Sequence, residues 1–166
     1  MKVSTLRALS PADGRYAGKV SALRDIFSEY GLIRFRVLAE VRWLQCLADE
    51  SAIPELGPLS PVMKDVLNKL VDDFSLDDAE RVKAIEETTN HDVKAVEYFI
   101  RERLGDGPET GPLKDFLHFG CTSEDINNVA YALMLRAARS DVLVPQMREV
   151  RTFLQSRARE HAGLPM

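Results

Sequence analysis

The sequence predicts an all-α fold, and two observations carry that prediction. Apolar residues recur at steps of three and four along most of the chain, which is the period of an α-helix buried on one side. The breaks that contain proline and glycine lie far apart, at 11–14, 54–61 and 105–112, so the segments between them are long. No segment alternates β-branched and polar residues over the length of a strand. We therefore expect helices throughout and no sheet.

The first long helix is expected from Phe27 to about Ala48. Its apolar positions follow the helical period; they are Tyr30, Ile33, Val37, Val41, Leu44 and Ala48. Phe35, Trp43 and Cys46 widen that face. This helix is therefore predicted to be buried on two sides.

Two further helix starts carry strong capping signals. Ser60 followed by Pro61 is an N-cap with proline at the first helical position. Ser75 with Asp78 three residues later resembles a capping box. The helix that begins there is expected to end in the threonine pair 88–89.

The last two helix starts lie in polar segments. Thr89 or Asn90 is expected to cap one helix, with an acidic residue in its first turn. After the break at 105–112, Thr122 or Ser123 is expected to cap the last one, whose first turn is also acidic.

The final helix has an unusually long apolar stripe, from Ile126 to Leu154. A single globular helix is typically shorter, and Pro145 lacks the N–H that a helix interior needs, so it should kink or divide the stripe. The remaining residues offer too little surface to cover this stripe. We therefore expect one member of a helical bundle whose other members lie outside these 166 residues.

Composition narrows the function classes. The 166 residues are 45% apolar and 29% charged, with a net charge of −4, which is typical of a globular protein and unlike a nucleic-acid binder with a basic stripe. No apolar run has the length of a membrane helix, and the first residues do not resemble a signal peptide. The two cysteines do not stand in a paired spacing such as C-x-x-C, and the three histidines are scattered along the chain. Neither disulfides nor a metal site is therefore expected. We therefore expect the protein to be located in the cytoplasm.

Three polar clusters stand out at loops or helix starts: SPADGRY at 10–16, TTNHDVKAVEYF at 88–99 and FGCTSEDINN at 119–128. Unpaired N–H groups at such starts favour anions, so Asn90, Thr122 and Ser123 could meet phosphate or carboxylate oxygens, and Arg15 adds a planar cation. Each residue also has a simpler structural interpretation, as a cap or a solvated surface residue. Spacing alone does not separate these interpretations.

Two other residues of these segments favour structural roles. His118 lies between Phe116 and Phe119, where a role in the core or behind a site is the better interpretation. Cys121 has no sequence context that would activate a thiol, so we expect a buried structural cysteine.

Together the three clusters resemble the bacterial-type adenylosuccinate lyases, a branch of the fumarase and aspartase superfamily. SPADGRYAGKVSALRDIFSEYGLIRFR is similar to the amino-terminal stretch of that family, TTNHDVKAVEYF to its second characteristic segment, and HFGCTSEDINN to the first superfamily signature. The three motifs occur in the family's order across nearly the whole chain. The resemblance implies an amino-terminal helical domain, here residues 1–111, followed at 112–166 by the first long helix of a central helical bundle that forms a homotetramer.

The resemblance also implies a reaction. Adenylosuccinate lyases eliminate fumarate from adenylosuccinate to give AMP, and from the succinylated aminoimidazole carboxamide ribotide, in purine nucleotide biosynthesis. The expected partners are a nucleotide substrate and further copies of the chain, with no cofactor, metal, nucleic acid or membrane.

Seven residues match the family's substrate-binding motifs. They are the nucleotide-binding pair Arg15 and Tyr16, the triplet Asn90, His91 and Asp92, and the pair Thr122 and Ser123 at the dicarboxylate end. We expect His91 to bind and orient rather than to catalyse. The family's general-acid histidine, in T-H-G-Q, and general-base serine, in S-S-x-M-P-x-K-x-N, would lie beyond Met166. No catalytic residue is therefore expected here, and the isolated chain is expected to be inactive.

Two alternatives remain open from the sequence. One is another lyase of the superfamily, such as argininosuccinate lyase or aspartase, against which the DGRY and NHD clusters argue. The other is a non-catalytic helical module that binds nucleotide or mediates oligomerisation.

Overall fold

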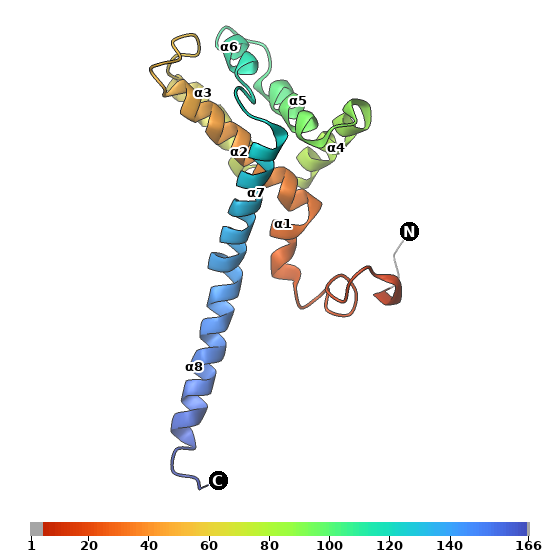
Figure 1. Cartoon of the computed structure of the whole chain (residues 1–166), viewed down its shortest axis with the longest axis vertical. Coiled ribbons are helices and arrows are strands. Elements are labelled where there is room, and N and C mark those ends of the chain that lie inside the picture. The colour runs from red at the N-terminus through yellow and green to blue at the C-terminus, as the bar shows by residue number, and fades with distance from the viewer. Residues whose placement is uncertain (1–4, 166) are drawn as a thin grey trace. The chain divides into compact units, whose positions relative to one another are not determined.

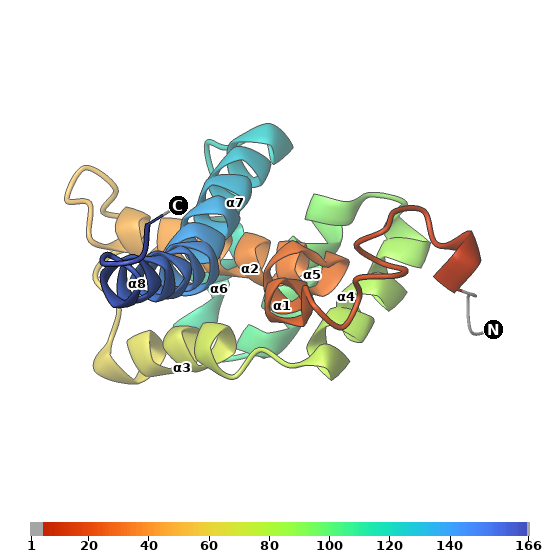
Figure 2. The ribbon, with the colours of Figure 1, turned by 90° about the horizontal axis from the view of Figure 1, so that it is seen from below.

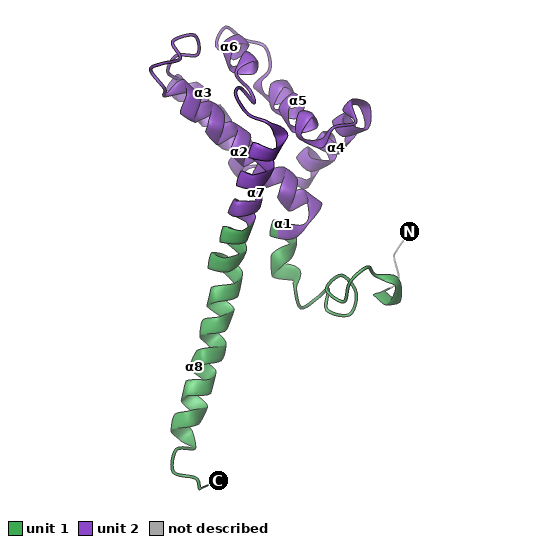
Figure 3. Cartoon of the chain, in the orientation of Figure 1, with its two compact units in different colours: residues 1–26, 135–166 green, residues 27–134 purple. Residues whose placement is uncertain are grey.

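The computed structural model describes residues 5–165, and it contains helices and no strand within that range (Figure 1). The predicted all-α class is confirmed. Contacts divide the chain into two compact units, coloured in Figure 3: unit 1 contains residues 1–26 and 135–166, and unit 2 contains residues 27–134. The domain division predicted between residues 111 and 112 is a different one and stays a prediction. Residues 1–4 and Met166, which both divisions include, lie outside the described residues.

Unit 2 is built around α2 (Glu29–Ala48), whose N-cap Ser28 accepts the N–H of Gly31. The helices α3 (Pro61–Asp72), α4 (Leu76–Thr89) and α5 (Asp92–Leu104) all pack against α2, as Figure 2 shows from below. The short α6 (Thr110–Asp115) packs on α5. The helix predicted from Phe27 is therefore the centre of this unit.

The main core joins the inner faces of these helices. Its fully buried side chains include Val37, Val41, Leu44, Leu67, Val82, Val96, Phe99 and Ile100. The two-sided burial predicted for α2 holds for Phe35. It is wrong for Cys46, which is exposed, because helical period identifies a face without showing how far the neighbours cover it.

The two strongest capping signals are confirmed. The Ser60 hydroxyl accepts the N–H of Met63 at 3.2 Å. Ser75 and Asp78 form a capping box, in which each side chain accepts the other residue's N–H, at 3.2 and 2.9 Å. As predicted, α4 ends at Thr89.

The predicted cap of α5 is wrong. Neither Thr89 nor Asn90 caps this helix; His91 does, because its Nδ1 accepts the N–H of Lys94 at 3.2 Å. Asn90 instead ends α4 in the left-handed conformation, with φ 51° and ψ 33°. Asparagine tolerates this conformation better than most residues, and the resulting turn makes the following residue the first one available as a cap.

The last helical stretch is divided as the proline predicts. It consists of α7 (Ser123–Ala137), a π-helical segment η3 (Ala138–Leu143) and α8 (Val144–Glu160). Pro145 lies in the first turn of α8, where its missing N–H costs least, and the wider π turn directly before it avoids the clash of its ring with a preceding carbonyl.

The rest of unit 1 is short. It contains the 3-10 turns η1 (Thr5–Arg7) and η2 (Ser21–Leu23), followed by α1 (Arg24–Phe27), and η2 packs against η3. Within the described part of the chain, no helix is both long and apolar enough to cross a membrane.

Phe99 should be among the most costly core residues to truncate. It is 1% exposed and packs edge-on against Phe74, with ring centroids 5.8 Å apart. Phe99→Ala should lower the free energy of unfolding by about 3–5 kcal/mol, measured by urea titration. The neighbouring Tyr98, 43% exposed, is the control, and Tyr98→Ala should cost about 1 kcal/mol or less. Equal losses in the two variants would contradict the placement of the core.

Candidate functional site

The SPADGRY segment of unit 1 folds into consecutive turns. The N–H of Tyr16 donates to the carbonyl of Pro11 at 2.8 Å. Gly14 lies where the backbone passes close to itself, since a Cβ there would be 2.7 Å from the carbonyl oxygen of Thr5. Arg15 and Tyr16 are exposed, with the guanidinium 5.4 Å from the centre of the ring. This turn therefore presents a cation and an aromatic face together at the surface.

The NHD triplet lies in unit 2, where α4 ends and α5 begins. The Asn90 side chain is exposed and has no hydrogen bond to another described residue. His91 is also exposed, and its Nδ1 accepts the N–H of Lys94, so its neutral form carries the proton on Nε2. Both residues therefore offer N–H donors to solvent at a helix N-terminus, where anions are favoured.

Both carboxylate oxygens of Asp92 are engaged within the protein. Oδ1 accepts the N–H of Val93 at 2.8 Å, and Oδ2 accepts from Nη2 of the buried Arg36 at 2.6 Å. Burial raises the pKa of Asp92, but the Val93 N–H and the Arg36 charge outweigh it and leave that pKa below its ordinary value. The same guanidinium donates through Nε to Oδ1 of Asn127 at 2.9 Å, which links the starts of α5 and α7.

The start of α7 separates the roles of Thr122 and Ser123. The N–H and the hydroxyl of Thr122 both donate to Oδ2 of Asp125, at 2.7 and 2.9 Å, and these bonds lower the pKa of Asp125. Thr122 is thus the residue fixed at this helix start. The hydroxyl of Ser123 has no hydrogen bond to any described residue, so it is available to a ligand.

A buried charged cluster lies behind this helix start. Nδ1 of His118 is 2.6 Å from Oε1 of Glu40 and 3.9 Å from Oε1 of Glu97, and Lys94 donates to the other oxygen of Glu97 at 2.7 Å. Glu40 is fully buried, and its Oε2 has no partner among the described residues. Burial raises the pKa of Glu40, and repulsion from Glu97 adds to that rise, although the His118 hydrogen bond opposes it.

His118 fits the structural role that the sequence favoured, whereas Cys121, which was expected to be buried, is only half-buried. The His118 side chain is largely buried and its backbone is left-handed, with φ 60°. Burial, and then the charges of Glu40 and Asp125, raise the pKa of the Cys121 thiol, which disfavours the nucleophilic thiolate. In residues 5–165, no group of three or more His, Cys, Asp or Glu could hold a metal ion.

Arg36, Glu40 and Asn127 are the residues of this region that sequence reasoning missed. The first two are charged positions within the largely apolar run GLIRFRVLAEV, which also contains Arg34, and that contrast was the available signal. Their partners lie 56 to 91 residues away in the sequence, so spacing along the chain gives no indication of them.

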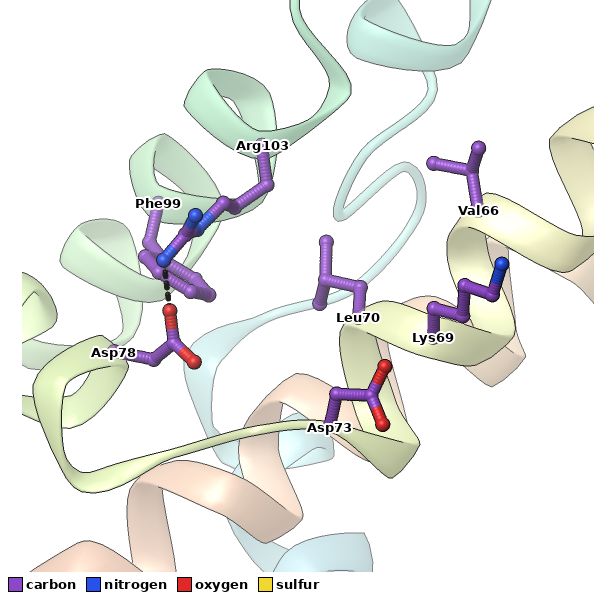
Figure 4. Close-up of a pocket in the computed structure, with 7 residues that line it drawn as sticks. All are labelled: Val66, Lys69, Leu70, Asp73, Asp78, Phe99 and Arg103. Carbon is purple, nitrogen blue, oxygen red and sulfur yellow. Dashed lines mark hydrogen bonds and ion pairs between the residues drawn. The ribbon is translucent and has the colours of Figure 1, made fainter.

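Unit 2 also contains a cavity of about 320 Å³ among α3, α4 and α5 (Figure 4). It is lined by Val66, Lys69, Leu70, Asp73, Asp78, Phe99 and Arg103. Asp78 forms an ion pair with Arg103, drawn as the dashed line, and Lys69 forms one with Asp65. None of the seven predicted binding residues lines this cavity, so we assign it no function.

Comparison with known proteins identifies the class. The lyase family model matches residues 14–166, so the chain belongs to the lyase family. Over all 166 residues the chain is 51% identical to the adenylosuccinate lyase of Escherichia coli K12, 49% to that of Haemophilus influenzae and 47% to that of Vibrio cholerae. The resemblance carried by the three clusters is confirmed. The chain spans 36% of the length of each of these relatives.

The raised pKa of Glu40 predicts a pH-dependent effect of Glu40→Gln. Because the folded protein holds this proton more tightly than the unfolded chain, the wild type loses stability as pH rises from 4.5 through the raised pKa. The variant does not lose stability in this way, because glutamine does not titrate. Its free energy of unfolding relative to wild type should therefore increase as pH rises above 4.5, by about 1.4 kcal/mol for each unit of pKa difference.

The matched control is Glu102→Gln. Glu102 is exposed, and the hydrogen bond from Arg81 lowers its pKa, so its stabilisation is lost as pH falls and the trend should be small and of opposite sign. Urea titrations at several pH values measure both trends. A Glu40→Gln difference that does not change with pH would show that Glu40 titrates normally in the folded protein.

Proposed function

We propose that this chain forms the amino-terminal part of an adenylosuccinate lyase. The enzyme would eliminate fumarate from adenylosuccinate to give AMP, and from the succinylated aminoimidazole carboxamide ribotide in the same way. The observation that carries this proposal is the match to adenylosuccinate lyases over all 166 residues, including all three polar clusters.

The elimination defines what the site must supply. A base removes a proton beside a carboxylate, negative charge gathers on that carboxylate, and an acid protonates the departing nitrogen. The protein must therefore direct hydrogen-bond donors at that carboxylate and hold the distant phosphate. The acid and the base of the family would come from the part of the enzyme beyond residue 166.

The described residues can supply such donors. At the start of α7 we propose that Ser123, with the nearby N–H groups, receives the dicarboxylate end of the substrate, while Thr122 keeps the helix start in place. At the start of α5, Asn90 and His91 would donate to the substrate, and Asp92 would hold that segment through Val93 and Arg36. Arg15 and Tyr16 would bind the nucleotide, through the phosphate and the base.

We also propose that the enzyme is a homotetramer, with residues 1–111 as its amino-terminal domain and 112–166 beginning the central bundle. The support is an exposed apolar seam at steps of four, three and four residues: Leu143, Met147, Val150 and Leu154. Such spacing is typical of a helix that packs along a second helix. A cytoplasmic location fits the nucleotide substrate and the two free cysteines.

Fumarate release by the full-length enzyme tests the function. Purified protein is mixed with adenylosuccinate, and both fumarate and AMP are quantified against a buffer blank. Equal amounts of the two products support the proposal. No release from adenylosuccinate, together with turnover of argininosuccinate or aspartate, would assign the chain to another lyase of the superfamily.

Ser123→Ala in the full-length enzyme tests the dicarboxylate assignment. A hydrogen bond to a charged group contributes about 1.5–3 kcal/mol, so kcat/KM should fall on the order of 10- to 100-fold, with part of the loss in kcat. Stability should hardly change, because the Ser123 hydroxyl makes no hydrogen bond in the described part of the protein.

The matched control is Ser60→Ala. This hydroxyl caps α3, so its loss should cost about 1 kcal/mol of stability and leave the kinetics unchanged. If Ser123→Ala behaves like Ser60→Ala in both measurements, Ser123 is a structural residue and the assignment fails.

Arg15→Ala should weaken substrate binding more than it slows the bound-state reaction, because we place Arg15 at the nucleotide end, away from the bond that breaks. Steady-state kinetics should show KM raised on the order of 10-fold with kcat little changed. Lys19→Ala, which removes another exposed cation of the same segment, is the control for general charge effects. A large fall in kcat at constant KM would contradict the binding role.

A further inference from the structure

Arg36 connects three helices through one buried guanidinium. Its side chain projects from α2 and is 6% exposed, and it donates to Asp92 at the start of α5 and to Asn127 in α7. The two acceptors are bound by different nitrogens of the same planar group, Nη2 and Nε. The relative direction of the two acceptors is therefore fixed by the geometry of the guanidinium.

Burial of this charge needs an explanation. A buried arginine is costly unless it is paired and hydrogen-bonded, and replacing such groups by apolar ones is often neutral or stabilising. Glu40, one turn further along α2, is also fully buried, and a local pair with Arg36 at this spacing would satisfy both charges. No such pair is present in the described structure; Glu40 bonds to His118 instead. Each charge therefore holds a segment from a different part of the sequence.

The segments held by Arg36 carry the candidate ligand donors. Asp92 directly follows His91, whose Nε2 is free for a ligand. Asn127 lies four residues after Ser123 in α7, so both side chains are on one face of that helix. Arg36 thus bonds to the face of α7 from which the unpaired Ser123 hydroxyl projects.

We propose that Arg36 is a positioning residue, which sets the separation of the His91 and Ser123 donors by holding Asp92 and Asn127 together. It does not touch the substrate. This inference rests on the proposed function, because it assigns these two donors to a single ligand. A misplacement of about 1 Å between such groups can cost on the order of 100-fold in rate.

The test uses Arg36→Met and Asn127→Leu in the full-length enzyme. Methionine keeps much of the buried apolar volume and removes both hydrogen bonds of Arg36. Asn127→Leu leaves the Arg36 bond to Asp92 and removes the bond to α7, together with an exposed bond from Asn127 to Glu124 within that helix. We expect kcat on adenylosuccinate to fall about 10- to 100-fold in Arg36→Met and by a smaller factor in Asn127→Leu. In the double variant the losses should not add, because both single changes break the same bond.

Arg42→Met is the matched control. Arg42 also projects from α2 and bonds to two side chains, those of Gln45 and Asn68, but it is exposed and bonds to neither α5 nor α7. Its loss should leave kcat and KM unchanged. Circular dichroism and thermal unfolding establish that each variant is folded at the assay temperature. If Arg36→Met does not fold, Arg36→Lys replaces it, because a single ammonium cannot reproduce both directed bonds.

Hydrogen exchange, measured without substrate, separates this inference from the proposed function. Exchange at the first turns of α5 and α7 should increase in Arg36→Met and stay unchanged in Arg42→Met. A wild-type enzyme that released no fumarate would overturn the proposed function, while this exchange result would still decide whether Arg36 holds the two helix starts. Wild-type kcat in folded Arg36→Met or Asn127→Leu, or fully additive losses, would overturn the positioning role.

Discussion

The structure of unit 2 depends on the burial of α2 with two charged residues on it. If α2 carried only apolar residues on its buried faces, it could pack against α3, α4 and α5 in several rotations about its axis, with similar free energies of folding. Arg36 and Glu40 remove that freedom, because each becomes costly as soon as its partner is displaced. The partners belong to the segments that begin α5 and α7. Within unit 2, the packing of the core and the placement of the two polar clusters at the starts of α5 and α7 therefore depend on the same helix.

The fold could be predicted largely because its signals are local. The Ser60–Pro61 and Ser75–Asp78 starts depend on hydrogen bonds between residues three positions apart, and such bonds can be read from sequence spacing. The cap of α5 could not be read in this way, because it depends on the left-handed turn at Asn90. The sequence offered Thr89 and Asn90 as caps, and only the backbone conformation shows that His91 takes this position.

For the candidate site, the sequence identified the residues at the helix starts but not their separate roles. The resemblance to adenylosuccinate lyases selected residues at exposed helix starts, and the structure places Asn90, His91, Thr122 and Ser123 there. The resemblance could not assign different roles to Thr122 and Ser123, because these roles depend on which of the two hydroxyls donates to Asp125. Nor could it identify Arg36, because the sequence does not show that two segments 35 residues apart, at Asp92 and Asn127, share one guanidinium.

The charges around these helix starts are consistent with an anionic ligand. A free carboxylate beside a dicarboxylate or phosphate would weaken binding, since like charges repel strongly where water is excluded. The carboxylates of this region are paired within the protein: Asp92 accepts from Arg36, Asp125 from the N–H and hydroxyl of Thr122, Glu97 from Lys94 and Glu124 from Asn127, and the buried Glu40 is bonded to His118. The groups left without a partner in the described structure include the Ser123 hydroxyl and the Asn90 amide. Internal pairing of the acidic residues thus leaves polar donors for the anionic substrate that we propose, so the order of these helix starts and the anion binding that we propose have the same physical origin.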